Sequence, residues 1–103
     1  MNEHAYREMM DRIQKMENMY NQLGAAMQSA PEQIKKNPAL IESAQTLCRY
    51  YNEGKWLHDY EADEKGLLPQ DLKRGVLSQD GLYDLLSQLT NYTKDKSGYD
   101  EKP

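Results

Sequence analysis

The chain has 103 residues, a formal net charge of -4, 38% hydrophobic residues and one cysteine, Cys48. A chain of this length and composition forms one domain with a thin core, and its acidic balance argues against broad nucleic-acid binding, which needs a basic face. One cysteine excludes an internal disulfide and favours a reducing compartment, and no apolar run reaches the roughly 18–20 residues of a membrane span. We therefore expect a cytoplasmic protein that binds neither nucleic acid nor membrane.

A heptad repeat over the first thirty residues predicts a long, coiled-coil-like amino-terminal helix. Its apolar positions are spaced three and four apart, and we call them the seam: Tyr6, Met9, Ile13, Met16, Tyr20, Leu23 and Met27. The residues between them predict a solvated face: Glu8, Asp11, Arg12, Lys15, Glu17 and Asn18. Burial of each large seam side chain contributes about 1.5–3 kcal/mol, against a few tenths for each i,i+4 pair such as Glu8–Arg12. The seam therefore has to pack against another helix.

Two proline signals follow the first helix. Ser29 and Glu32 have the spacing of a capping box around Pro31, and Asn37 precedes Pro38 as a cap should. The apolar face of residues 38–51 then predicts a second helix. We expect the first helix to pack antiparallel on this second helix.

Two shorter helices complete an all-α fold. Gly54, expected in a left-handed conformation, precedes a helix over Lys55–Lys65, and Gly66 follows it. The inward-facing residues of this helix are predicted to be Trp56, Leu57 and Tyr60. Ser78 is the expected cap of a last helix that ends near Tyr92.

Residues 67–77, which we call the elbow, join these two helices. Pro69 predicts a tight turn, and Gly75 predicts a backbone angle that other residues avoid. We therefore expect residues 1–93 to form a single helical domain. Residues 94–103 have almost nothing to bury and are expected to be disordered.

From Tyr51 to Leu86 the sequence resembles a family of short bacterial proteins, the domain of unknown function 4298 family. The residues that carry the resemblance are Tyr51, Trp56, Asp59-Tyr60-Glu61, Asp63, Leu68-Pro69, Asp71-Leu72-Lys73-Arg74-Gly75-Val76-Leu77-Ser78, Asp80 and Tyr83 to Leu86. The resemblance implies a helical, cytoplasmic bacterial protein and brings no assigned activity with it. His58 and Cys48 lie outside the pattern.

The candidate ligand or ion-pair site lies within the same stretch. It comprises Trp56, Asp59, Tyr60, Glu61, Asp63, Asp71, Lys73 and Arg74. Lys73 and Arg74 could anchor a phosphate or carboxylate, but a pairing with the nearby acids is the preferred interpretation, and we expect Arg74 to tie the elbow to the Trp56–Asp63 helix. Trp56 with Tyr51, Tyr60 and Tyr83 could line an aromatic pocket, although a small core is favoured.

The pattern favours a non-enzymatic helical module for protein interaction or self-association, with no cofactor, no metal and no catalytic residue. The seam is longer than the second helix can cover, so we expect a protein partner or a second copy to bind through the first helix. The alternative is a small-ligand, anion- or metal-binding protein that uses the Trp56–Arg74 region. His58, Asp59, Glu61, Asp63 and Glu64 form the densest titratable cluster, but a metal site requires converging ligands that the spacing does not supply.

Overall fold

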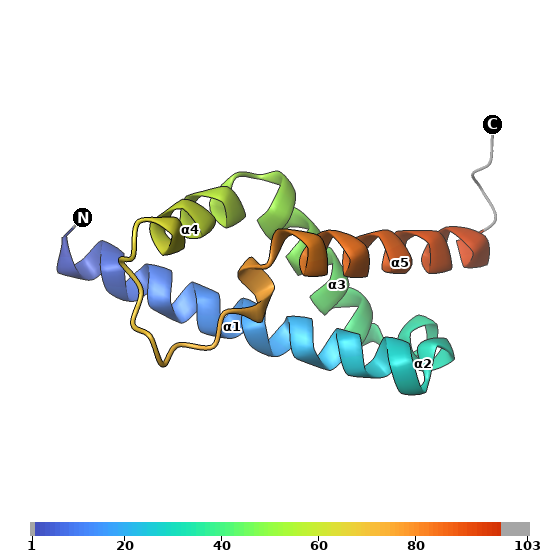
Figure 1. The fold of residues 1–103 in the computed structure, drawn as a ribbon. Helices are drawn as coiled ribbons and strands as arrows, with labels where there is room; N and C mark the ends of the chain where they lie inside the picture. Colours follow the sequence, from blue (N-terminus) through green and yellow to red (C-terminus); the bar gives the residue numbers. More distant parts are fainter. Residues whose placement is uncertain (1, 98–103) are drawn as a thin grey trace.

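The computed structural model describes the backbone of residues 2–97 and the side chains of residues 2–90. Five α-helices and one 3-10 turn occur in this part of the chain, and no strand does (Figure 1). They are α1 (Glu3–Ser29), α2 (Pro31–Lys36), α3 (Pro38–Asn52), α4 (Lys55–Glu64), the 3-10 turn η1 (Gly75–Leu77) and α5 (Gln79–Ser97). The fold is therefore all-α, as predicted. No helix of the described part combines the length and apolar character needed to cross a bilayer.

The long helix α1 is the base on which the other elements pack. It begins at a capping residue, Asn2, whose Oδ1 accepts a hydrogen bond from the Ala5 amide at 2.7 Å. Figure 1 shows α3 leading from α2, at the far end of α1, back to α4, with η1 inserted between α1 and α5. The predicted contact between α1 and α3 is present, and α2, η1 and α5 also contact α1.

The seam is covered within the chain. Met9, Ile13, Met16 and Leu23 are buried, and Tyr6, Tyr20 and Met27 are half-buried against the same core. As predicted, α1 is longer than α3, but α2, η1 and α5 also contact α1 and cover the part of the seam that α3 leaves open. This burial removes the observation on which the predicted partner or second copy at the seam rested.

The helix junctions follow the sequence signals with one exception. Asn37 Oδ1 accepts from the Ala39 and Leu40 amides at 3.0 and 3.3 Å, and Pro31 and Pro38 occupy the first turns of α2 and α3. The predicted capping box of Ser29 and Glu32 is wrong. Ser29 is the last residue of α1, and its hydroxyl donates to the Ala25 carbonyl at 2.9 Å, so it has no role at the start of α2.

Of the three glycines singled out in the sequence analysis, Gly54 and Gly66 are required by the backbone conformation and Gly75 is not. Gly54 and Gly66 have φ of 96° and 74°, a conformation that side-chain-bearing residues rarely adopt. The prediction for Gly75 is wrong, because no other described residue has a positive φ and a Cβ there would meet the Glu17 carboxylate at an ordinary 3.4 Å. Leu57, predicted to face inward, is 50% exposed because it lies on the outer side of α4.

The helix α5 begins as predicted and ends later. Ser78 Oγ accepts from the Gly81 amide at 3.2 Å, which places Ser78 at the start of the helix. A Cβ on Gly81 would lie 2.5 Å from the Tyr20 hydroxyl, so the glycine permits α5 to approach α1 closely. The helix continues past Tyr92 to Ser97, and the predicted disorder of residues 94–103 stays a prediction. Residues 98–103 of the predicted tail lie outside the described residues.

Candidate functional site

One face of α4 carries three residues of the family-like signature. Trp56, Asp59 and Asp63 are spaced i, i+3 and i+7, which places them on the same side of a helix. We call these three residues the signature face. Each of them bonds to a different part of the fold, and the geometry of these bonds decides what the signature does.

Asp59 is the centre of a buried polar network. Its side chain has 0% exposure and accepts two hydrogen bonds from the Arg12 guanidinium. Arg12 Nε lies 2.9 Å from Oδ2, and Nη2 lies 2.5 Å from Oδ1. The Tyr50 hydroxyl donates to Oδ2 at 2.7 Å, and His58 Nδ1 lies 3.0 Å from Oδ1. The network therefore joins α4 to α1 through Arg12 and to α3 through Tyr50.

The electrostatics of this network keep Asp59 ionised. Burial alone would raise the pKa of Asp59, but the hydrogen bonds from Arg12, His58 and Tyr50 together outweigh it and lower the pKa. Hydrogen bonding to Asp59 raises the pKa of Arg12 in turn. Burial, followed by the hydrogen bond to Asp59, raises the pKa of the Tyr50 hydroxyl. A carboxylate that has four hydrogen-bond contacts with three residues and no exposure is a structural anion rather than an exposed general base.

Arg12 corrects the prediction of a solvated face on α1. The sequence paired Arg12 with Glu8, whereas the Arg12 side chain is only 20% exposed and bonds to Asp59, 47 residues away in the chain. Within the described part of α1, Arg7 instead pairs with Glu3, and His4 Nε2 lies 3.4 Å from Glu8 Oε2. Nothing local distinguishes Arg12 from its neighbours, because its partner is fixed by tertiary packing.

Trp56 and Glu17 hold the backbone of Val76 from two sides. The Trp56 indole N–H donates to the Val76 carbonyl at 3.0 Å, and Glu17 Oε1 accepts from the Val76 amide at 2.8 Å. Glu17 is 8% exposed, so its assignment to the solvated face is also wrong. A buried carboxylate at this amide satisfies a donor of η1 that the turn leaves unpaired. The Val76 side chain is fully buried. The two hydrogen bonds from Trp56 and Glu17 hold η1 between α1, α4 and α5.

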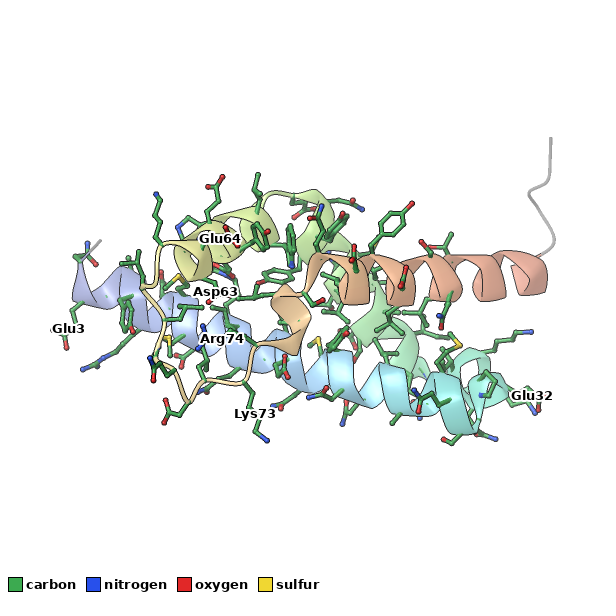
Figure 2. The ribbon with its side chains drawn as sticks, viewed as in Figure 1. Glu3, Glu32, Asp63, Glu64, Lys73 and Arg74 are labelled. Carbon is green, nitrogen blue, oxygen red and sulfur yellow. The ribbon has the colours of Figure 1, made fainter. Side chains whose placement is uncertain are left out.

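Asp63 connects the signature face to the elbow through Arg74. The guanidinium of Arg74 pairs with the Asp63 carboxylate and donates to the Pro69 carbonyl, and its Nε donates to the Leu72 carbonyl at 3.3 Å. Figure 2 shows Arg74 turned toward Asp63 and Lys73 turned away from α4. The interaction holds the turn that begins at Pro69, where the Leu72 amide donates to the Pro69 carbonyl at 3.2 Å. Arg74 is thus engaged inside the fold.

The aromatic residues pack as a small group around Trp56. The ring of Tyr60 stacks on Trp56 with a centroid separation of 4.9 Å, and Tyr51 lies at 5.2 Å with a tilt of 55°. Trp56 is buried, and Tyr51 and Tyr60 are half-buried against the core. Tyr83, which the sequence placed with them, is 57% exposed on α5. The aromatic group therefore covers the joint between α3 and α4.

The remaining candidate residues are exposed. Glu61 and Glu64 lie on the solvent side of α4, and Asp71 and Lys73 lie on the elbow. Asp59 and Asp63 of the titratable cluster face different partners, so the cluster does not converge. Within the described residues, no group of three histidine, cysteine or acidic side chains is placed to hold a metal ion.

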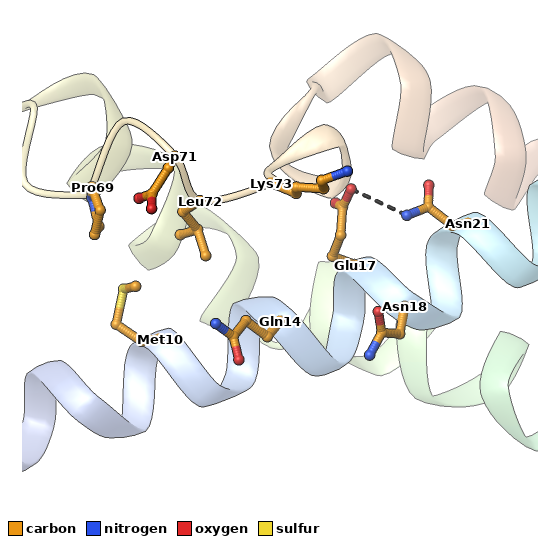
Figure 3. Close-up of a pocket in the computed structure, with 9 residues that line it drawn as sticks. All are labelled: Met10, Gln14, Glu17, Asn18, Asn21, Pro69, Asp71, Leu72 and Lys73. Carbon is orange, nitrogen blue, oxygen red and sulfur yellow. Dashed lines mark hydrogen bonds between the residues drawn. The ribbon is translucent and has the colours of Figure 1, made fainter.

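A cavity of about 380 Å³ separates the elbow from α1 (Figure 3). It is lined by Met10, Gln14, Glu17, Asn18, Asn21, Pro69, Asp71, Leu72 and Lys73. Asn21 Nδ2 donates to Glu17 Oε2 at 3.2 Å inside it. Asp71 and Lys73 are the two predicted site residues that the structure brings to this cavity. The α1 residues were missed, because the polar strip beside the seam has the composition of any solvated helix face.

The family assignment agrees with these observations. Residues 13–96 match the family described as Domain of unknown function (DUF4298). The chain belongs to this family. Neither the curated proteins nor the solved structures include a match to the chain. Trp56, Asp59 and Asp63, three of the residues on which the resemblance was based, are those that bind α4 to η1, to α1 and α3, and to the elbow.

Proposed function

We propose that the chain is a non-enzymatic protein-interaction module that binds a partner in the open cavity between α1 and the elbow, which we call the groove. The observation that carries the proposal is the composition of this groove. Its lining includes four exposed side chains for which no hydrogen bond or ion pair occurs among the described residues, namely Gln14, Asn18, Asp71 and Lys73. The signature face, by contrast, is engaged throughout in bonds within the chain.

The partner would still bind through the first helix, as the sequence analysis expected, but on the side of α1 that faces the elbow instead of on the seam. The seam is buried, whereas Met10, Gln14 and Asn18 follow one another at i, i+4 and i+8 on the side of α1 that faces the elbow. Met10 is half-buried, and Gln14 and Asn18 are exposed. A partner in this groove would contact α1 without opening the core.

A small ligand in the same cavity is the second candidate. A volume of about 380 Å³ is within the range of small-molecule sites, roughly 300–1,000 Å³, and Lys73 and Asp71 offer one charge of each sign. The open shape of the groove and its row of side-chain amides favour a macromolecular partner. A polypeptide also provides the several backbone groups that such a row would bind.

Site-specific photo-crosslinking in the cells that make the protein tests the proposal. A benzophenone amino acid replaces Gln14 or Asn18 in the groove, and, as controls, the exposed Glu42 of α3 or Lys55 of α4. We expect one protein, identified by mass spectrometry, to be crosslinked from the two groove positions and from neither control. The purified partner should then bind the wild-type chain and lose affinity for Asn18→Arg, but not for Glu42→Arg.

Two results would contradict the proposal. One is crosslinking of the same proteins from groove and control positions. The other is the absence of a protein adduct together with a specific rise in melting temperature in a small-molecule screen, abolished by Lys73→Glu, which would favour the small ligand.

A further inference from the structure

We infer that the occupant of the groove is an extended peptide segment of about five residues, with an apolar side chain at one end and a carboxylate at the other. This inference rests on the proposed function, and it adds the chemistry and orientation of the partner. It is carried by three features of the groove, which are a row of side-chain amides, an apolar end and a charge at the opposite end.

The row of amides matches a peptide backbone. Gln14, Asn18 and Asn21 are spaced by four and three residues along α1, which places them about 6 and 4.5 Å apart along the helix axis. Each side-chain amide offers both donors and an acceptor, as a peptide group does. An extended chain repeats its groups on one edge about every 6.6–6.8 Å. The step of about 6 Å from Gln14 to Asn18 is close to this repeat, so a strand laid along α1 would present a peptide group to each of these two amides. The step to Asn21 is shorter than the repeat, so Asn21 borders the end of that strand.

The fold leaves these amides available for such bonds. Asn21 donates one N–H to Glu17 Oε2 at 3.2 Å, so its carbonyl oxygen is left to accept. Glu17 is used by the Val76 amide and by Asn21, and it fixes Asn21 in place. The side chains of Gln14 and Asn18 are exposed at the groove.

The apolar end of the groove is formed by Met10, Pro69 and Leu72. All three are half-buried, and Figure 3 shows them together at one end, with Glu17, Asn21 and Lys73 at the other. An apolar side chain of the occupant would be sheltered here from water. From Met10 to Asn21 the helix advances by about 16 Å, a distance that about five extended residues span.

The charges of the groove set the direction of the occupant. Lys73 is exposed, and its ammonium forms no ion pair within the described residues. Glu17, the acid at this end, is buried and both of its oxygens accept hydrogen bonds from the chain, whereas Lys73 is exposed. A partner therefore contacts the ammonium of Lys73 rather than the carboxylate of Glu17. Asp71 lies at the apolar end and would repel an acid there. The carboxylate of the occupant therefore belongs beside Lys73.

A displayed library of random octapeptides, selected on the immobilised full-length chain, tests the inference. We expect enrichment of peptides with an apolar residue followed or preceded, about four positions away, by Asp or Glu. A labelled peptide from the selection should bind Lys73→Glu about tenfold more weakly, because the reversal replaces an attraction by a repulsion. Replacing the acid of the peptide by Lys should restore binding to Lys73→Glu. The matched control Lys55→Glu makes the same change of net charge away from the groove and should bind like the wild type.

The outcomes separate the inference from the proposed function. If the groove positions crosslink a protein but the library yields no acidic peptide, or Lys73→Glu binds the selected peptide unchanged, the inference is wrong and the proposed function stands. If the crosslinks and the selection both fail, the proposed function is wrong as well. Enrichment of basic peptides would overturn the inference directly.

Discussion

Asp59 shows how a single residue can determine the meaning of a signature. Read from the sequence, it belongs to an acidic cluster that could serve a ligand, yet it is fully buried and bonded to Arg12, Tyr50 and His58. Such a carboxylate carries a large desolvation cost that only its partners offset. The structure therefore places Asp59 in a network of several simultaneous partners rather than in a ligand site.

Tyr50→Phe tests the pH dependence of this network. In the folded chain the pKa of Tyr50 is raised, so its contribution to stability is present below the ordinary tyrosine value of about 10 and is lost as the pH rises beyond it. At pH 7 we expect Tyr50→Phe to be less stable by about 1.5–3 kcal/mol, because a bond to a charged group is lost. The difference should shrink above about pH 10, by up to about 1.4 kcal/mol per pH unit.

Urea denaturation of both proteins at several pH values provides the measurement. The stability of the fold at acidic pH depends on Asp59 instead. Because the pKa of Asp59 is lowered in the folded chain, its contribution to stability is present above its unfolded pKa of about 3.9 and is lost as the pH falls through the folded pKa. Because Asp59 keeps its bonds to Arg12 and His58 in this variant, Tyr50→Phe should still lose stability as the pH falls. A difference between the two proteins that stays constant from pH 7 to 11 would show that the Tyr50 hydroxyl is not buried against Asp59.

At the scale of elements, the local signals predicted the helices and failed where distant segments meet. Asn37, Pro38, Gly54 and Ser78 act through their own neighbours, so their positions were correct. The bonds of Arg12 to Asp59 and of Glu17 to Val76 join residues 47 and 59 positions apart. No local spacing encodes such pairs, and both residues resemble those of an exposed helix face. The groove was missed for the same reason, because it exists only once the elbow lies over α1.

Alanine substitution of Gly54 and Gly75 tests which of these glycines the backbone conformation requires. Gly54→Ala forces a side chain into the left-handed region at φ 96°, and we expect it to lower the free energy of unfolding by about 1–2 kcal/mol. Gly75→Ala meets only ordinary contacts and no positive φ, so it should be neutral or stabilise by up to about 1 kcal/mol. Thermal and urea unfolding of the two variants check this. A larger loss from Gly75→Ala than from Gly54→Ala would contradict the described backbone.

Arg74→Ala tests how the elbow is held. Its pair with Asp63 and its bonds to the Pro69 and Leu72 carbonyls fix the elbow turn. We expect faster hydrogen exchange for the amides of residues 70–74, with a loss of global stability of only about 1 kcal/mol, since the pair is partly exposed. Hydrogen-exchange mass spectrometry measures both. Lys73→Ala is the matched control, and equal exchange in the two variants would mean that Arg74 does not hold the turn.

At the scale of the whole molecule, the chain covers its own apolar surface by wrapping several short elements around one long helix. The all-α class and the need to cover the seam followed from periodicity. Periodicity did not predict which elements cover the seam, because η1 and α5 contact α1 only when the elbow folds back over α1. With the seam inside, the free polar side chains of α1 at the elbow become the surface on which the proposed partner binds.

Substitution at the centre of the seam tests whether one chain is enough to cover it. Ile13 is fully buried, so Ile13→Ala should lower the free energy of unfolding by about 2–5 kcal/mol and Ile13→Val by about 0.5–1.5 kcal/mol. The second variant keeps the test usable if the first does not fold. The urea midpoint of the wild type and of Ile13→Val should be independent of protein concentration. A midpoint that rises with concentration would indicate that a second copy covers the seam.

Native-state hydrogen exchange of Asp59→Asn tests most directly whether the signature face unites the fold. The substitution removes the charge opposite Arg12, and breaking a buried pair costs about 3–5 kcal/mol. Because Asp59 joins α4 to α1 and α3, we predict that the slowest amides of all three helices lose the same free energy of protection. Protection lost from α4 alone, with α1 and α3 as in the wild type, would contradict this account.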